Sequence, residues 1–85
     1  MTVVYSDNAR KQLKKLDGRT SRLILSYMDE VAQLKDPRSR GKILVGNLAG
    51  FWRYRVGDYR VLCRIQDKEL CIVVIELGNR REVYK

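Results

Sequence analysis

A stretch of alternating residues near the middle of the chain could place several arginines side by side. The runs Phe51–Val56 and Tyr59–Ile65 are rich in β-branched and aromatic residues, and Gly57-Asp58 between them favours a two-residue hairpin turn. Side chains alternate across a strand, so every second residue lies on the same face. We therefore expect one face of the hairpin to carry Arg53, Arg55, Arg60 and Arg64.

The expected register places two like charges directly opposite each other. A two-residue turn pairs Arg55 with Arg60, which costs the free protein a few tenths of a kcal/mol to about 1 kcal/mol. The nearest hairpin carboxylates, Asp58 and Asp67, fall in turns, so no acidic residue is expected on that face. Because a guanidinium is a fork-shaped donor that matches phosphate, the pattern favours a phosphate-binding surface over an ordinary solvated strand face.

The end of the chain, GNRREVYK, could extend this surface. Arg80, Arg81 and Lys85 add cations, and Tyr84 offers a ring on which an unpaired base can stack for about 1–3 kcal/mol. We expect Gly78 to break the last strand and turn the tail towards the arginines. The alternative is a frayed basic terminus.

Composition supports a polyanionic partner and excludes several kinds of catalysis. Lys and Arg number 18 against 10 Asp and Glu, which gives a net charge of +8 and an isoelectric point near 9.9. The chain has no histidine, so Ser-His and Cys-His nucleophile pairs are excluded and a zinc site is not expected. We expect neither a metal nor a cofactor, and any proton transfer must use other side chains.

The two cysteines, Cys63 and Cys71, lie in apolar runs and do not form a CxxC motif. They are interpreted as buried thiols. Neither a signal peptide nor a membrane-spanning segment is expected, which predicts a cytoplasmic protein with no membrane partner. The length of 85 residues predicts one domain, residues 1–85.

Elements that must support the hairpin precede it in the sequence. Thr2–Tyr5 is predicted to be a strand, followed by Ser6 or Asp7 as a helix cap. Three residues at helical spacing give the first helix its apolar stripe: Ala9, Leu13 and Leu16. Gly18 is expected to end that helix in a left-handed conformation.

A second, longer helix is predicted to stop at Asp36-Pro37, because the residue before a proline avoids the helical region. Its apolar stripe consists of Ile24, Tyr27, Met28, Val31 and Leu34. Residues 38–50 are expected to be an ordered connection with Leu44 and Leu48 tucked beneath it, and Leu70–Leu77 is expected to be the third strand of an antiparallel meander. The result is an α+β fold in which a two-helix hairpin covers one face of the sheet.

The run GFWRYRVGDYRVLCRI, residues 50–65, and the terminal GNRREVY resemble the RelE/ParE toxin superfamily. The similarity extends over nearly the whole chain, including the order of elements and the Asp36-Pro37 helix stop. The hairpin pattern is typical of the superfamily, whereas the spacing from Arg80 to Tyr84 is similar to the RelE branch.

The resemblance to the RelE branch implies a ribosome-dependent endoribonuclease, an mRNA interferase that enters the A site. In that chemistry the ribose 2′-hydroxyl attacks the adjacent phosphate and leaves a cyclic phosphate. The resemblance implies that Arg60 stabilises the charge on the phosphate, that Arg80 binds the phosphate or the leaving group, and that Tyr84 stacks on the base or orients the hydroxyl.

Arg53 and Arg55 occupy positions where relatives have lysines, one of which is thought to assist proton removal. A guanidinium is a poor general base. Three explanations remain open: the reaction relies on positioning and charge, a residue among Glu82, Tyr84 and Lys85 contributes, or the activity is weak.

The resemblance also implies a cognate antitoxin that binds the toxin in a hetero-oligomer and covers its basic site. Two other functions remain open. Members of the ParE branch share the hairpin but inhibit DNA gyrase without being nucleases. A toxin-like fold that has lost its activity and serves only as a binding module is the other alternative.

Overall fold

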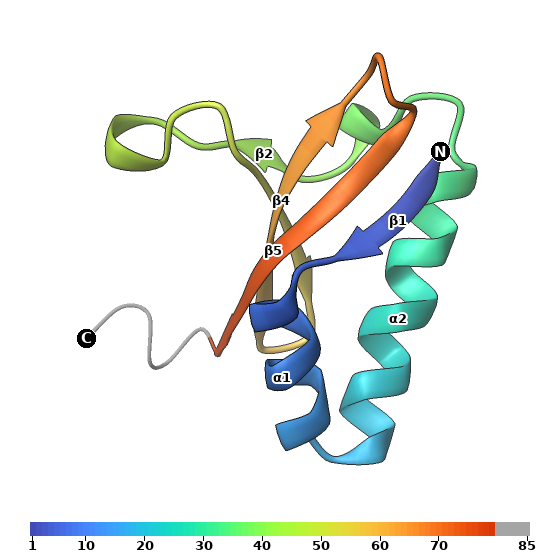
Figure 1. The fold of residues 1–85 in the computed structure, drawn as a ribbon, viewed down its shortest axis with the longest axis vertical. Helices are drawn as coiled ribbons and strands as arrows, with labels where there is room; N and C mark the ends of the chain where they lie inside the picture. The colour runs from blue at the N-terminus through green and yellow to red at the C-terminus, as the bar shows by residue number, and fades with distance from the viewer. Residues whose placement is uncertain (80–85) are drawn as a thin grey trace.

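The computed structural model describes residues 1–79, which form a five-stranded sheet and two α-helices (Figure 1). In chain order the elements are β1 (Thr2–Tyr5), α1 (Asp7–Lys15), α2 (Gly18–Gln33), the short 3-10 helix η1 (Pro37–Ser39), β2 (Lys42–Ile43), the 3-10 helix η2 (Gly46–Leu48), β3 (Trp52–Val56), β4 (Tyr59–Gln66) and β5 (Cys71–Asn79). The expected α+β class, with a first strand, a helical hairpin and an antiparallel meander, is confirmed.

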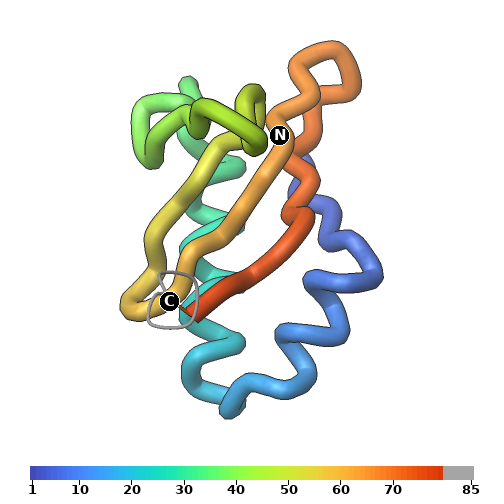
Figure 2. Tube along the Cα trace, turned by 90° about the vertical axis from the view of Figure 1, so that its left-hand side faces the viewer, coloured from blue at the N-terminus to red at the C-terminus, as the bar shows by residue number. Residues whose placement is uncertain are grey.

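The sheet order is β1-β5-β4-β3-β2, so the first and last strands of the described chain lie side by side. Strands β2 to β5 pair antiparallel with their neighbours, whereas β1 pairs parallel with β5. The two helices make the crossover between β1 and the meander, and in Figure 2 α2 lies behind the strands while α1 lies beside β5. The other face of β3, β4 and β5 is turned towards the viewer in that figure.

Both helices begin at side chains that accept from an otherwise unpaired amide. The Ser6 hydroxyl accepts from the Ala9 amide at 3.0 Å, and the Asp17 carboxylate accepts from the Thr20 amide at 3.0 Å. The prediction that Gly18 ends the first helix was wrong. Leu16 is the C-cap of α1 in an extended conformation, and Gly18 is the first residue of α2. Asp17 is the N-cap of α2, so the second helix begins directly after Asp17. No residue in a left-handed conformation is needed to end α1.

Helix α2 ends three residues earlier than the proline suggested. Its last residue is Gln33, and Asp36 is extended as expected before Pro37. Pro37 is buried and opens η1. None of the helices within residues 1–79 is long and apolar enough to cross a membrane.

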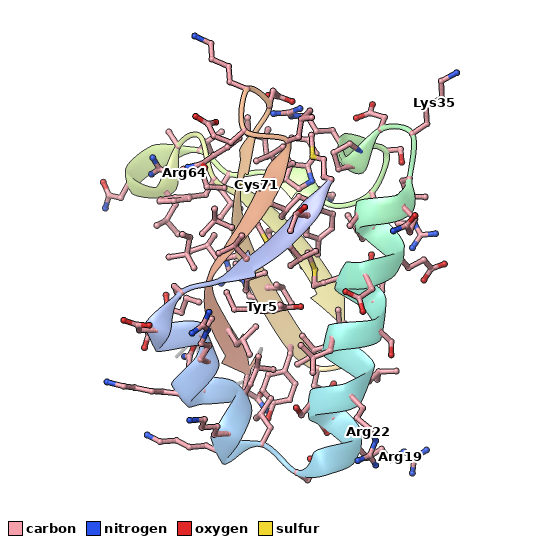
Figure 3. All side chains as sticks on the ribbon, turned by 45° about the vertical axis from the view of Figure 1, so that its right-hand side comes forward. Tyr5, Arg19, Arg22, Lys35, Arg64 and Cys71 are labelled. Atoms are coloured by element: carbon pink, nitrogen blue, oxygen red, sulfur yellow. The ribbon has the colours of Figure 1, made fainter. Side chains whose placement is uncertain are left out.

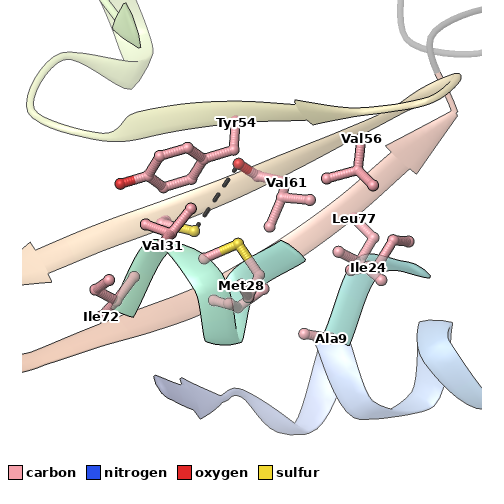
Figure 4. Packing of buried hydrophobic residues seen from close by; sticks show 11 residues of the cluster. Ala9, Ile24, Met28, Val31, Tyr54, Val56, Val61, Ile72 and Leu77 are labelled. Carbon is pink, nitrogen blue, oxygen red and sulfur yellow. Dashed lines mark hydrogen bonds between the residues drawn. The ribbon is translucent and has the colours of Figure 1, made fainter. Parts of the chain in front are cut away.

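The core lies between the helices and the inner face of the sheet (Figure 4). Ile24, Met28 and Val31 of α2 are fully buried, as the helical spacing predicted. They pack with side chains from the three long strands: Tyr54, Val56, Val61, Cys63, Ile72, Val74 and Leu77. Burial raises the pKa of the Cys63 thiol to about 12, so this thiol is a neutral core group.

Cys71 is not a core thiol, which corrects the sequence-based interpretation. It is half-buried at the start of β5, and its Sγ lies 3.4 Å from the Gln66 Oε1. Leu70, expected to begin this strand, instead lies in the preceding turn with a φ of 52° and 65% of its surface exposed.

The connection between α2 and β3 is anchored by two aromatic side chains, the buried Tyr54 and the half-buried Trp52. The Tyr54 hydroxyl donates to the Pro37 carbonyl at 2.7 Å, and the Trp52 indole donates to the Arg40 carbonyl at 2.7 Å. Between these anchors Gly41 has a φ of +79° and lies against the backbone of Arg53, where a Cβ would collide with the Arg53 carbonyl. The connection therefore reaches the sheet edge and adds β2, which the sequence pattern did not predict.

Candidate nucleic-acid interface

The predicted hairpin register is confirmed: Arg55 pairs with Arg60, and Val56 pairs with Tyr59 across the Gly57-Asp58 turn. We call the side of the sheet that faces away from the helices the open face. Cross-strand pairing and alternation place a set of basic residues on it: Lys42, Arg53, Arg55, Arg60 and Arg64. Lys42 belongs to the set because β2 pairs it with Arg53. The sequence did not predict β2, so it did not predict this position of Lys42.

The open-face arginines differ in how firmly they are held. Arg55 and Arg64 are exposed, and the Arg64 guanidinium lies 4.7 Å from the centre of the Phe51 ring. Arg53 is half-buried, and its Nε atom is buried without a hydrogen-bond partner. A buried N–H group without a partner favours binding of a ligand that supplies a hydrogen-bond acceptor.

The ion pairs formed within residues 1–79 lie elsewhere. Arg38 binds Asp67 through two contacts of 2.9 Å, and Arg40 binds Glu30 at 3.3 Å. The Arg38 guanidinium holds the pKa of the Asp67 carboxyl below its ordinary value. Two surface carboxylates of the described residues, Asp67 and Glu30, thus pair with arginines of the connection.

One carboxylate does lie on the open face, contrary to the sequence-based expectation. Glu76 pairs with Leu62, whose side chain lies on the same face as its strand neighbours Arg60 and Arg64. Strict alternation from the buried Ile72 and Val74 would have placed residue 76 in the core. The register shift between Leu62 and Cys63 inserts one extra residue in β5 and reverses the alternation after it.

A cavity of about 290 Å³ opens on this part of the sheet. Its lining combines leucines, a cation and an anion: Leu48, Arg60, Leu62, Glu76, Leu77 and Gly78. Leu48 was expected to lie beneath the connection, but η2 carries it outward and 40% of its surface is exposed. Gly78 does not break the strand as predicted. It pairs with Arg60, and β5 continues to Asn79.

Helix α1 holds the backbone of β5 next to this cavity. Strand β1 pairs with β5 only as far as Val74, and side chains then take over the exposed edge. Ser6 donates to the Ile75 carbonyl at 2.7 Å. The Gln12 side-chain amide accepts from the Leu77 amide at 2.7 Å and donates to the Leu77 carbonyl at 2.6 Å. These contacts fix the strand on both sides of Glu76.

Basic residues also occur far from the open face. In Figure 3, Arg64 lies near one end of the molecule, whereas Arg19 and Arg22 of α2 lie near the other. Within the described part of the chain, no cluster of three or more His, Cys, Asp or Glu side chains could hold a metal ion.

The predicted tail residues Arg80, Arg81, Tyr84 and Lys85, and Glu82 with them, lie outside the described residues. Their roles stay predictions. The four hairpin arginines are brought together on the open face, whereas their roles in binding or catalysis also stay predictions.

Comparison with known proteins places the chain in a family. Residues 3–84 match the model of the family described as ParE toxin of type II toxin-antitoxin system, parDE. Toxin RelG of Mycobacterium tuberculosis is 34% identical over 87 residues, which cover 99% of this chain and 95% of that protein.

Solved structures with the same fold include toxins crystallised with antitoxins. The toxin-antitoxin complex RelBE2 of Mycobacterium tuberculosis matches with a TM-score of 0.84 and 32% identity, over 93% of this chain and 90% of that chain. The archaeal RelE-RelB complex of Pyrococcus horikoshii OT3 matches with a TM-score of 0.72 and 26% identity, over 93% of each chain. The isolated E. coli RelE toxin shares the fold, with a TM-score of 0.75 and 20% identity over 98% of this chain and 89% of that chain. The chain belongs to the RelE/ParE superfamily of toxins from type II toxin-antitoxin systems.

Proposed function

We propose that this toxin is an mRNA interferase, a ribosome-dependent endoribonuclease that cuts messenger RNA in the A site and thereby inhibits translation. The observation that carries the proposal is the concentration of guanidinium groups on the open face beside a cavity that Arg60 lines. Arginine is the side chain best suited to binding phosphate oxygens in pairs. An RNA backbone lying along β3 and β4 meets these groups in succession.

In the proposed reaction the 2′-hydroxyl of one nucleotide attacks the adjacent phosphorus. Arg60 stabilises the negative charge that develops on the phosphate oxygens, a contribution that reaches 10² to 10³-fold for a single well-placed donor, on the order of 3–4 kcal/mol. Arg53, Arg55 and Arg64 hold the backbone on either side. Arg80 and Tyr84 serve the leaving group and the base, with Arg81 and Lys85 as further RNA contacts.

The proposed partners are the ribosome with its messenger RNA and a cognate antitoxin. Relatives with the same fold crystallise as RelBE complexes. A net charge of +8 on a small toxin calls for a competitor with an acidic or amphipathic segment that covers the open face. We therefore expect a toxin-antitoxin hetero-oligomer in the cytoplasm, in which the single domain of residues 1–85 is inhibited until the antitoxin leaves.

The test adds the purified toxin to a translation extract and to the same messenger RNA without ribosomes. Cutting only when ribosomes are present, with 2′,3′-cyclic phosphate ends, is expected. Arg60→Ala should reduce the cutting rate at least tenfold, whereas Arg19→Ala, at the other end of the molecule, should leave it within twofold. An intact message in the complete extract contradicts the proposal.

A non-nuclease function has one observation in its favour, since the matching family model is described as a ParE toxin. ParE-type inhibition of DNA gyrase predicts loss of supercoiling with the message intact. The same preparation is therefore assayed with gyrase and relaxed plasmid. A protein that binds an antitoxin but does neither is a binding module that has lost activity.

A further inference from the structure

The structure points to Glu76 as the general base that removes the proton from the attacking 2′-hydroxyl. This inference rests on the proposed ribonuclease function and assigns the proton acceptor within the same site. Glu76 is exposed on the open face and lines the 290 Å³ cavity together with Arg60. Among the described residues that strand pairing places beside Arg60, it is the one with a carboxylate.

The reaction needs a proton acceptor that the arginines cannot provide. A guanidinium is a poor general base, so Arg53, Arg55 and Arg60 are suited to stabilising negative charge and not to accepting a proton. The chain contains no histidine. Lys42 lies on the open face, but it is exposed and lines a different cavity with Tyr27, Arg53 and Arg55. An ammonium group in water stays charged, and only a desolvated lysine serves as a base.

A local irregularity of the sheet brings the carboxylate to this position. With regular alternation Glu76 would face the helices and Leu77 would face the solvent. The extra residue opposite Leu62 and Cys63 reverses both, so Leu77 is buried with 4% exposure and Glu76 joins Arg60. Burying a carboxylate among the core side chains would be costly. The bulge therefore places an apolar side chain, Leu77, in the core and a carboxylate, Glu76, on the open face.

The pairing register places the two charged groups at diagonal positions of adjacent strands. Arg60 is opposite Gly78 and Glu76 is opposite Leu62, so the two residues are diagonal neighbours, which typically lie roughly 7–8 Å apart with a somewhat shorter distance between their Cβ atoms. Gly78 has no side chain and lines the same cavity as Arg60. A phosphate bound by the guanidinium thus has its neighbouring ribose within reach of the carboxylate.

The O2′ lone pair forms a bond to phosphorus while the hydroxyl proton passes to a Glu76 carboxylate oxygen. The bond from phosphorus to O5′ breaks, its electron pair stays on O5′, and that oxygen takes a proton from water or from a donor of the ribosomal site. The products are a 2′,3′-cyclic phosphate and a 5′-hydroxyl, and Glu76 then releases its proton to solvent.

The experiment measures single-turnover cutting of messenger RNA on programmed ribosomes across a range of pH, with the full-length toxin. The wild-type rate constant should fall at acid pH, because a protonated carboxyl accepts no proton. Glu76→Gln should lower the rate constant by about 10² or more and abolish its acid limb. Ribosome binding should be unchanged or tighter, because the substitution removes a negative charge from a basic surface.

Two controls separate chemistry from folding. Glu69→Gln makes the same substitution at an exposed turn residue just before β5 and should leave both the rate and its pH profile unchanged. Glu76→Asp keeps the carboxylate and should retain an acid limb at a reduced rate. Thermal unfolding of each variant shows whether a slow variant is simply unfolded. If Glu76→Gln is destabilised, the pH profile of Glu76→Asp shows whether the carboxylate at position 76 accepts the proton.

The outcomes distinguish this inference from the proposed function. If the wild type does not cut at all, the ribonuclease proposal fails. If the wild type cuts and Glu76→Gln cuts at the same rate, or more slowly with its acid limb intact, the assignment of Glu76 is overturned while the ribonuclease proposal stands. In that case Lys42→Met and Glu82→Gln identify which other group accepts the proton.

Discussion

The two faces of the β3–β4 hairpin come from the same alternating sequence but serve different ends. On the inner face Tyr54, Val61 and Cys63 are fully buried. On the open face Arg55 and Arg64 are exposed, and Arg55 stands opposite Arg60. The inner face stabilises the fold through apolar burial, whereas like charges on the open face oppose folding slightly. The contrast teaches that stability and polyanion binding can be changed separately in this protein.

Substitution of the inner layer should give the largest effect and leave RNA binding alone. Met28→Ala removes a fully buried side chain of α2 and should lower the free energy of unfolding by about 2–5 kcal/mol. Urea denaturation measures the loss. The folded fraction should bind single-stranded RNA with the wild-type affinity. A core variant that stays stable but loses RNA binding would break the separation of the two faces.

Tyr54 tests how the core supports the connection at the edge of the open face. Tyr54→Phe removes the hydroxyl that donates to the buried Pro37 carbonyl, which should cost about 1–3 kcal/mol. Burial raises the pKa of this hydroxyl, so it keeps its proton and the bond at any ordinary pH. Chemical denaturation gives the cost, and Trp52→Phe is the matched variant for the second anchor. An unchanged stability would show that these anchors are dispensable.

Arg55 distinguishes the two faces because its removal should increase stability and weaken RNA binding. Arg55→Ala relieves the cross-strand repulsion with Arg60 and should raise the free energy of unfolding by a few tenths of a kcal/mol to about 1 kcal/mol. RNA binding should weaken at the same time. Thermal unfolding and RNA titration of one preparation give both values. A loss of stability would mean that the open face contributes to folding.

The smallest expected effect concerns the ion pair between Arg38 and Asp67, outside both faces. Arg38 lowers the pKa of Asp67 below the ordinary value of 3.8, so the pair stabilises the folded state above that pH. The contribution is lost as the pH falls through the lowered pKa. Asp67→Asn should therefore lower the melting temperature slightly at pH 7, and this difference from the wild type should shrink as the pH falls below 3.8. An equal difference above and below that pH would contradict this account.

Regular periodicity made the hairpin and the helices predictable. The turn residues Gly57 and Asp58 set the register, and the register fixed the faces of Arg53, Arg55 and Arg60. In the same way the spacing of Ile24, Met28 and Val31 identified the buried side of α2. These features depend on local geometry, which neighbouring residues determine.

Features that depend on contacts between distant segments were missed. Strand β2 forms because two aromatic side chains anchor residues 37–40, and η2 then carries Leu48 to the cavity. Glu76 reaches the open face only through a bulge, and bulges leave no clear signal in an alternating sequence. One clue existed, because regular alternation from Ile72 and Val74 would have buried a glutamate.

The salt dependence of RNA binding tests most directly whether the open face binds a nucleic-acid backbone. The logarithm of the association constant for a single-stranded RNA should fall linearly with the logarithm of salt concentration, by about 0.7 per neutralised phosphate. The double variant Arg53→Ala/Arg55→Ala should reduce this slope by about 1.4, whereas Arg19→Ala/Arg22→Ala should leave it unchanged. A wild-type slope near zero, or the same slope in the open-face variant, would contradict the account.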